Sequence, residues 1–390
     1  MMTVRKKILL ITPFPFYPLT GGNRVRLHNL ITAMRDMGHE ITCIHLQQED
    51  ADQGYMQQLL ESRIYTIPVV NSSRNVSCKN SFIDTVRNVL AVKRRYPKNI
   101  DTLYDRSVWD KIAEIGRTVN PDVVMAQYVF CSKALESFGS KTLKVIDTHD
   151  VFGDRHNIYR TLKLTPIWHS FRKHDEAAGL SRADIVIAIQ KNDALYFSNL
   201  LPEKKIITVG HLTCLNRLPQ KQSSFDMLYV GSRAFFNRYS VQWFLDKVFP
   251  KILGNYPQSR LILVGRICQY IKDRPGVIKL GVVPSYEEIY QKASIVINPV
   301  RGGTGLKIKN IEALGYAKAL VTTSNGALGL EDGAYESFLV ADKPGDFSDH
   351  VIRLFSDPSF REALSQKAYT FAENWNQTQI NNLRLALDVA

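Results

Sequence analysis

The sequence lacks the features that mark metal sites, disulfide frameworks and membrane spans. Among its 390 residues are five cysteines, and they lie far apart, at Cys43, Cys78, Cys131, Cys214 and Cys268. Their spacing fits no zinc motif and their odd number fits no disulfide framework, so we expect a reducing compartment. No apolar run approaches the roughly 20 residues that a membrane-spanning helix needs, and the run at 8–11 is too short for a signal-peptide core. We therefore expect a cytoplasmic protein, at most bound peripherally to the inner face of a membrane.

The chain also has no low-complexity segment and no basic tail. Its formal net charge is +13, and the positive excess is shared between the two halves. A basic protein favours anionic partners, such as nucleotides, phospholipid headgroups or nucleic acid. Basic and aromatic residues are only sparsely interleaved, which argues against a nucleic-acid partner. Neither a heptad pattern nor an obvious apolar patch indicates an oligomeric state.

Short apolar runs alternate with amphipathic stretches, which is typical of α/β folds with parallel sheets. We expect strands near residues 8–11, 41–44, 123–125, 143–146, 185–187 and 206–209, then 227–230, 261–264, 277–278, 295–297 and 320–322. We expect helices near residues 23–37, 81–95, 101–118, 131–138, 238–253, 344–356, 358–373 and 376–388. The length suits two domains. We place an N-terminal domain at 1–211, a linker at 212–224, a C-terminal domain at 225–373 and a last helix at 374–390.

The most informative stretch is a glycine loop that follows the expected strand 295–297. Gly302, Gly303 and Gly305 allow a tight turn, and from Leu306 the apolar spacing becomes helical. A loop between a strand and a helix start directs backbone N–H groups and the positive helix end at its guest, so an anion such as a diphosphate is expected. Lys307 and Lys309 add positive charge. The alternative is a loop that only turns the chain.

Two further positions carry polar side chains of interest. Glu312 lies beyond the loop, where it can accept hydrogen bonds from a sugar or can simply be a solvated carboxylate near a helix start. His149 follows the expected strand 143–146, at the edge where parallel sheets bind ligands. It can donate to a sugar hydroxyl or a phosphate oxygen, or form a structural pair with a neighbouring carboxylate. No second ligand stands at metal spacing, so we predict no metal site.

The expected helix 81–95 ends in a basic cluster and continues to 98. Apolar residues share one of its faces, and Lys93, Arg94 and Arg95 stand at its end. Basic residues are favoured at any helix C-terminus, so a docked surface helix is one interpretation. Contact with an anionic lipid or acceptor is the other.

Taken together, these motifs resemble the group 1, GT4-like retaining glycosyltransferases of GT-B fold. The resemblance covers nearly the whole chain. It is carried by Gly21-Gly22 after the first strand, by the segments 38–41 and 147–150, by Gly231-Ser232-Arg233, and above all by 303–314 with its continuation at 319–323 and 329–330.

The resemblance implies two Rossmann-like domains facing a cleft, with a UDP- or GDP-linked sugar on the C-terminal domain and a saccharide or lipid-linked acceptor on the N-terminal one. It implies no metal and no cofactor, because cationic side chains stabilise the diphosphate. It also implies transfer with retained anomeric configuration. Catalytic roles fall to His149, Arg233, Arg238 and Lys307; donor binding to Gly22, Gly231, Gly303, Thr304, Gly305, Leu306, Lys309 and Glu312; and the acceptor side to Asp150 and Arg155.

Two positions depart from the family pattern. Arg238 stands where the family has a lysine, which keeps the charge but changes its shape. Thr304 stands where a first acidic residue is common, so the sequence leaves open which residue grips the donor sugar. We expect a hexosyltransferase-type enzyme of bacterial surface polysaccharide synthesis. The alternatives are another GT-B sugar-nucleotide enzyme, such as an epimerase, and a non-catalytic protein that binds anionic ligands.

Overall fold

The structure is a computed structural model of the chain, and it describes residues 4–47, 51–69, 99–161, 169–217, 226–283 and 285–388. The chain forms two compact units. The first comprises residues 1–19, 23–209 and 382–390, and the second comprises 20–22 and 210–381. The basic segment 81–98, interpreted as either a docked surface helix or a contact for an anionic lipid or acceptor, lies outside the described residues.

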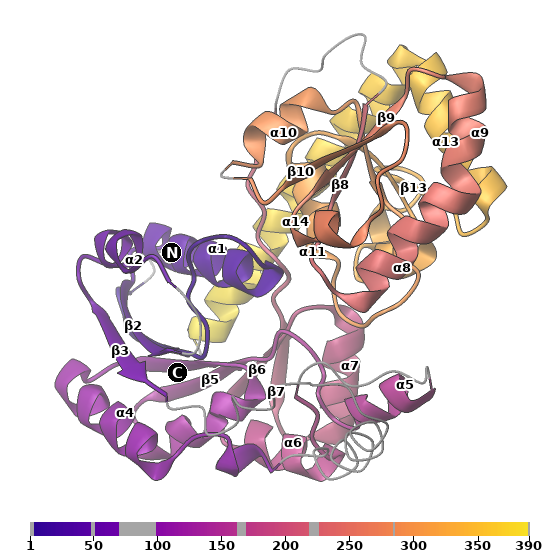
Figure 1. Cartoon of the computed structure of the whole chain (residues 1–390). Coiled ribbons are helices and arrows are strands. Elements are labelled where there is room, and N and C mark those ends of the chain that lie inside the picture. Colours follow the sequence, from indigo (N-terminus) through magenta and orange to yellow (C-terminus); the bar gives the residue numbers. More distant parts are fainter. Residues whose placement is uncertain are drawn as a thin grey trace. The chain divides into compact units, whose positions relative to one another are not determined.

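The first unit contains a parallel sheet in the order β3-β2-β1-β4-β5-β6-β7. Its strands are β1 (Lys7–Thr12), β2 (Glu40–Gln47), β3 (Ile64–Pro68), β4 (Val123–Gln127), β5 (Leu143–Asp147), β6 (Ile185–Ala188) and β7 (Lys205–Thr208). Its helices are α1 (Gly22–Asp36), α2 (Gln53–Leu59), η1 (Ile100–Thr102), α4 (Arg106–Val119), η2 (Val129–Ser137), α5 (Arg155–Thr161), α6 (Lys173–Leu180) and α7 (Lys191–Leu200). In Figure 1, α1 lies on one side of this sheet and α4 and α6 lie on the other.

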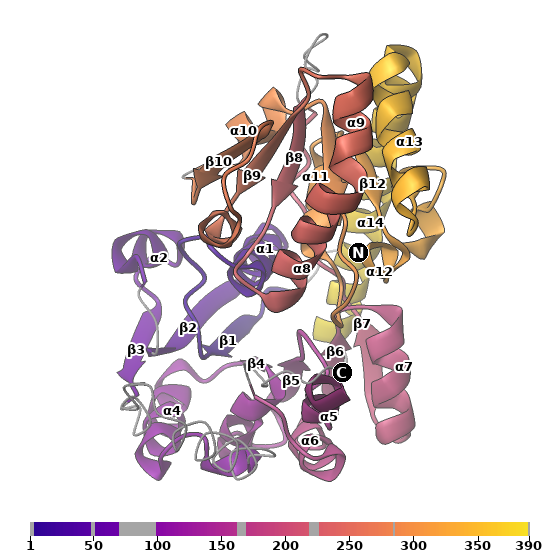
Figure 2. The same ribbon diagram turned by 45° about the vertical axis from the view of Figure 1, so that its right-hand side comes forward.

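The second unit contains a parallel sheet in the order β10-β9-β8-β11-β12-β13. Its strands are β8 (Asp226–Val230), β9 (Arg260–Val264), β10 (Val277–Gly281), β11 (Ile295–Asn298), β12 (Ala319–Thr322) and β13 (Leu339–Val340). Its helices are α8 (Phe235–Trp243), η3 (Phe244–Val248), α9 (Phe249–Asn255), η4 (Arg266–Tyr270), α10 (Glu287–Lys292), α11 (Ile308–Gly315), α12 (Ser324–Ala327), η5 (Glu331–Gly333), α13 (Pro344–Ser356) and α14 (Pro358–Leu387). Figure 2 shows α8, α9 and α13 together on one side of its strands.

The core of the second unit follows from strand alternation. Successive side chains of a strand point to opposite faces, and here the alternate residues Met227, Tyr229, Leu261 and Leu263 enter one apolar cluster with the buried side of α8, α9 and α13. The intervening residues of these strands are buried as well. Strands buried on both faces read as continuous apolar runs, which is why the sequence revealed most of them.

Helix α14 differs from the prediction of two helices, 358–373 and 376–388. It runs unbroken from Pro358 to Leu387, because neither proline nor glycine stands at the expected break. Its polar side chains there bond sideways to the segment 210–213. Trp375 Nε1 donates to the carbonyl of His211, and Asn376 both accepts from the Thr213 N–H and donates to its carbonyl. These bonds occupy part of the predicted linker 212–224.

Other differences are local. The helix predicted near 131–138 is the 3₁₀-helix η2, and the helix predicted near 238–253 begins earlier, at Phe235, and contains a π-helical turn over Phe244–Val248. The short strands β3 and β13 were not predicted, because neither carries a long apolar run.

Candidate functional site

In the second unit, the predicted donor residues lie at the carboxyl ends of two adjacent strands. The sheet order reverses between β8 and β11, which are neighbours with connections leading away in opposite directions. Open α/β sheets bind ligands at such a switch point. The segment 231–238 follows β8, and the glycine loop 301–307 follows β11. The fold therefore places both predicted motifs of this unit at one site.

The glycine loop needs its glycines for two physical reasons. Gly303 has φ +98° and Gly305 φ +76°, a backbone region that side chains disfavour. A Cβ atom at Gly302 would lie 2.4 Å from the ring of Phe236, so this glycine lets α8 pack against the loop. Helix α11 begins at Ile308, two residues later than predicted, because the backbone of Lys307 is still non-helical. The N–H groups of Ile308 and Asn310 already bond to Leu306 and Lys307, so the helix start offers fewer free donors than expected.

Lys307 curls back over the loop that precedes it. Its Nζ lies 2.8 Å from the carbonyl oxygen of Gly305 and 3.4 Å from those of Gly303 and Thr304. The ammonium group therefore donates to three carbonyl oxygens of the loop and stabilises its turn. Thr304 is exposed and Leu306 is buried.

Lys309 ties the start of α11 to the end of β8 and to α8. Its Nζ donates to the Tyr229 hydroxyl at 3.0 Å and to Asn237 Oδ1 at 3.1 Å, and it lies 4.3 Å from the centroid of the Tyr229 ring. Burial first, and then the charge of Lys307, lower the pKa of Lys309 to about 7, while the charge of Glu312 acts in the opposite direction. Its ammonium form is thus sensitive to a nearby anion, which would favour protonation.

Glu312 lies one turn further along α11. Burial raises its pKa to about 7, although the charge of Lys309 acts in the opposite direction. Its carboxylate lies 3.9 Å from Nε2 of the buried His211, and its side chain is 25% exposed. A carboxylate that is largely desolvated and still accessible is suited to accept hydrogen bonds from a ligand's hydroxyl groups.

The arginines of the second motif are arranged around the start of α8. Gly231 directly follows β8, and Arg233 is exposed. The guanidinium of Arg238 lies 4.8 Å from the ring centroid of Tyr270, and its Nε is buried with no hydrogen-bond partner among the described residues. A buried, unsatisfied cationic donor is costly unless a ligand completes it.

A polar network behind the loop was missed by sequence reasoning. Asn310 accepts from Asn298 Nδ2 at 2.7 Å and donates to the hydroxyl of Thr322 and the carbonyl of Gly326. The Thr322 hydroxyl in turn donates to the carbonyl of Asn298. The network joins the ends of β11 and β12 to α11, so it fixes the loop from behind. The asparagine and threonine at the ends of two apolar runs are the only signal that could have indicated it.

In the first unit, His149 lies where predicted, after β5, in a strained backbone conformation. Its φ is +57°, which is uncommon outside glycine and occurs at functional sites. Its Nε2 lies 2.6 Å from Gln127 Oε1 and 3.1 Å from Asp147 Oδ2. Burial lowers the pKa of His149, although Asp147 acts in the opposite direction. With Nε2 engaged, Nδ1 is the nitrogen that can contact a ligand.

Asp147 also holds Arg26, which sequence reasoning did not single out. Arg26 Nε and Nη2 donate to the two carboxylate oxygens at 3.0 and 2.7 Å, and both side chains are fully buried. Burial alone would raise the pKa of Asp147, but the charges of Arg26 and then of His149 outweigh it, so the pKa lies well below its usual range. The pair links α1, which begins at Gly22, to the end of β5.

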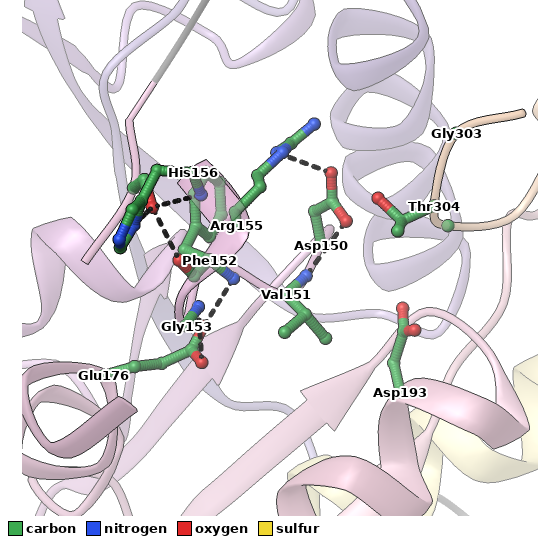
Figure 3. A network of polar contacts seen from close by, with 12 residues as sticks. Asp150, Val151, Phe152, Gly153, Arg155, His156, Glu176, Asp193, Gly303 and Thr304 are labelled. Atoms are coloured by element: carbon green, nitrogen blue, oxygen red, sulfur yellow. Dashed lines mark hydrogen bonds and ion pairs between the residues drawn. The ribbon is translucent and has the colours of Figure 1, made fainter. Parts of the chain in front are cut away.

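Asp150 and Arg155, assigned to the acceptor side, form an ion pair. Arg155 Nη1 lies 2.8 Å from Asp150 Oδ2, and Asp150 Oδ1 accepts from the Val151 N–H. Figure 3 shows this pair beside a second set of contacts, in which Glu176 binds the backbone of Phe152 and Gly153. Glu176 was not predicted, because a glutamate in a short helix carries no distinctive sequence signal.

Within the described ranges, no three His, Cys, Asp or Glu side chains lie together in a way that would hold a metal ion. No helix in those same ranges combines the length and apolar character needed to cross a bilayer.

Several solved structures that are similar to this chain over nearly its whole length have the GT-B fold. TarM of S. aureus is similar with a TM-score of 0.72, at 10% identity and full coverage of both chains. Sucrose-phosphate synthase from Thermosynechococcus elongatus gives a TM-score of 0.66, at 13% identity over 98% of this chain and 97% of its own. HepE of Anabaena, solved with UDP and glucose, gives 0.62 at 13% identity, over 97% and 99% of the two chains. The protein thus has the GT-B fold, with two Rossmann-like domains, as predicted.

The second unit also contains a match to a known protein family. Residues 224–357 match the family described as "Glycosyl transferases group 1". The predicted resemblance to group 1 glycosyltransferases is therefore confirmed over this part of the chain. A curated relative, an "Uncharacterized 44.6 kDa protein in cps region" of Klebsiella pneumoniae, is 23% identical over 96% of this chain and 97% of its own.

Proposed function

We propose that the protein is a retaining, hexosyltransferase-type glycosyltransferase that moves a sugar from a UDP- or GDP-linked donor to a saccharide or lipid-linked acceptor. One observation carries the proposal. Around the switch point of the second unit, Arg238 and Lys309 come from two different helices whose first turns are joined through Asn237. The glycine loop with Lys307 lies beside them. Converging cationic groups of this kind suit a nucleoside diphosphate.

The charge pattern suits departure of a diphosphate. Breaking the bond between sugar and phosphate places negative charge on the leaving group, and Arg233, Arg238 and Lys307 are the residues we assign to stabilise it. Preorganised donors of this type are worth about 3–4 kcal/mol each. We assign the ribose to Glu312, whose carboxylate remains accessible. No side chain is assigned as a nucleophile, so we propose front-face transfer, in which the diphosphate assists removal of the acceptor's proton.

The acceptor is proposed from the relatives. The Klebsiella relative lies in a cps region, and one TarM structure contains fondaparinux, α-GlcNAc-glycerol and UDP. A saccharide or glycolipid acceptor in bacterial surface polysaccharide synthesis is the corresponding proposal here. We assign the acceptor to the first unit, near Asp150 and Arg155, with His149 nearest the donor sugar.

We further propose that transfer needs no metal ion, because the cationic side chains named above supply the positive charge. A panel of nucleotides and nucleotide-sugars, measured by thermal shift with and without a chelator, tests this. A ligand at a hundred times its dissociation constant adds roughly 2.7 kcal/mol of stability. We expect one nucleoside diphosphate to raise the melting temperature equally with and without chelator. A shift that the chelator abolishes would refute the metal-free mechanism, and no shift for any ligand would refute the donor site.

Two variants test the residues directly. Lys307→Ala and Glu312→Ala are expected to abolish transfer while the far-UV circular dichroism spectrum persists. Lys251→Ala is the matched control, because this lysine pairs with Asp349 on the helical layer formed by α9 and α13. Full transfer activity in both site variants would refute the assignment.

The same assays separate the alternatives. A putative UDP-N-acetylglucosamine 2-epimerase from Listeria monocytogenes has a similar fold, with a TM-score of 0.59 at 12% identity. An epimerase would convert the nucleotide-sugar with no acceptor present. A non-catalytic binding protein would show a raised melting temperature in the nucleotide panel but no conversion of the nucleotide-sugar.

A further inference from the structure

Glu176 of α6 is a buried carboxylate whose two oxygens both bind the loop that follows β5. Its Oε1 accepts from the Phe152 N–H at 2.7 Å, and its Oε2 accepts from the Gly153 N–H at 2.9 Å. The Tyr196 hydroxyl of α7 donates to Oε2 at 3.1 Å. The side chain is fully buried. One carboxylate therefore accepts hydrogen bonds from two consecutive backbone N–H groups, as Figure 3 shows.

The loop bound by Glu176 also carries the residues assigned to the acceptor side. His149 and Asp150 precede the two amides, separated from them by Val151, and Arg155 follows them after Asp154. The left-handed backbone of His149 and Asp154, with φ of +57° and +54°, sets the course of this loop. Conformations of this kind persist only where surrounding contacts hold them. Glu176 supplies such contacts at the centre of the loop.

The loop has a second support. Phe171 donates its N–H to the carbonyl of Phe152 at 3.2 Å, and Asp154 donates its N–H to the carbonyl of Phe171 at 2.7 Å. Both of these backbone contacts are neutral and do not change with pH. The charged contact by Glu176 is therefore an addition whose strength depends on ionisation, since bonds to a charged acceptor are about twice as strong as neutral ones.

The surroundings of Glu176 make that ionisation sensitive to pH. Burial raises its pKa from 4.5 to about 7, although the two backbone N–H groups and the Tyr196 hydroxyl act in the opposite direction. The charged and titratable groups facing it are Tyr196 from α7 and Asp150 from the loop, whose charge adds to the increase. Lys173 of α6 itself packs against the same Gly153.

We propose that Glu176 is a positioning residue that sets the geometry of the acceptor-side loop and makes that geometry depend on pH. The ionised carboxylate accepts from both amides. When a solvent proton adds to one oxygen, that oxygen becomes an O–H donor facing an N–H donor, and one amide loses its acceptor. The loop then moves, and with it Asp150 and Arg155. The inference rests on the proposed function for the role of the loop, but not for the contact itself.

The first test measures the contact without any substrate. Hydrogen exchange of the peptide that spans 150–156 is followed by mass spectrometry from pH 5.5 to 8.5 and corrected for the intrinsic pH dependence of exchange. Glu176→Gln places a donor where an acceptor was, so we expect about tenfold faster exchange at pH 8. The wild type should lose its protection as pH falls through about 7. Equal protection in both proteins, or no pH dependence in the wild type, would overturn the proposal.

The second variant separates positioning from a structural role. Tyr196→Phe leaves both amides bound to Glu176 but removes a hydrogen bond that favours its ionised form. The pH at which protection is lost should therefore rise. Glu203→Gln is the matched control, because this glutamate is exposed in the same unit, and it should match the wild type. An unchanged midpoint in Tyr196→Phe would contradict the role of ionisation even if Glu176→Gln failed to fold.

The third measurement connects the loop to turnover. Release of UDP from UDP-glucose, or of GDP from GDP-mannose, is measured as a function of pH with and without acceptor glycans. We expect an acid limb near pH 7 in the wild type that moves upward in Tyr196→Phe and is absent in Glu176→Gln, whose rate stays low throughout. Absence of turnover of either donor at any pH would count against the proposed function, and the exchange measurements would still decide the contact. Turnover with no acid limb would overturn the role of Glu176 in the reaction.

Discussion

Arg26 and Asp147 form a buried, two-pronged ion pair, with both side chains fully enclosed and both carboxylate oxygens bound at 3.0 and 2.7 Å. Arg26 Nη2 also donates to the carbonyl of Val209. The pair therefore joins α1, the end of β5 and the residue after β7. Because Asp147 also contacts Nε2 of His149, the pair fixes the imidazole as well.

Removing one partner of this pair leaves a charge buried without compensation. We expect Arg26→Ala to lower the free energy of unfolding by about 3–5 kcal/mol, measured by urea denaturation. The double variant Arg26→Met with Asp147→Leu removes both charges, so it should unfold at a higher urea concentration than Arg26→Ala. A double variant less stable than Arg26→Ala would show that packing, and not charge, governs this position.

The glycine loop makes a prediction about Gly303. A residue with a side chain is strained at φ +98° however much space surrounds it. The cost is about 1–3 kcal/mol. Gly303→Ala should lower the melting temperature and weaken UDP binding in isothermal titration calorimetry. Gly254→Ala is the control, since a Cβ at Gly254 meets no atom within 4 Å and φ there is not positive. Undiminished UDP affinity in Gly303→Ala would indicate that the loop does not contact the diphosphate.

Arg238 is the residue whose unsatisfied donor most directly indicates an anion. Hydrogen bonds to charged groups contribute about 1.5–3 kcal/mol, so Arg238→Ala should weaken UDP binding by about tenfold or more. Arg238→Lys should recover only part of the affinity, because lysine lacks the planar fork of donors. Arg353→Ala is the matched control: Arg353 also stacks on an aromatic ring, that of Phe360, but on α13. Equal losses in Arg238→Ala and Arg353→Ala would point to a general loss of charge or packing.

The features that could be predicted from the sequence are those marked by both residue type and residue spacing. The buried strands, the glycine loop and the position of His149 after β5 follow from apolar runs and from glycine placement. The helix start at Ile308 was missed by two residues, because the apolar spacing begins before the backbone becomes helical.

The supporting side chains could not be predicted in the same way. Arg26 lies 121 positions from Asp147, and Glu176 lies 24 positions from Phe152. Such pairs form only when the sheet brings distant segments together, and an arginine or glutamate in a helix otherwise indicates an exposed face. The network of Asn298, Asn310 and Thr322 likewise forms only because folding brings two strands and a helix together.

The last prediction concerns the pH dependence of stability at Glu176. Its pKa is raised from 4.5 to about 7 in the folded chain, so the folded state binds a proton more tightly than the unfolded state. The stability that this proton confers is fully present below pH 4.5 and is lost as pH rises through 7. Glu176→Gln is neutral at every pH and cannot lose it. Between pH 5 and 8, the free energy of unfolding of the wild type should therefore fall by roughly 3 kcal/mol relative to that of Glu176→Gln, measured by urea denaturation at each pH. The exposed Glu203→Gln should follow the wild type throughout. Parallel curves for the wild type and Glu176→Gln would mean that Glu176 titrates near its ordinary value, and its carboxylate would then hold the loop equally at all pH values above 5.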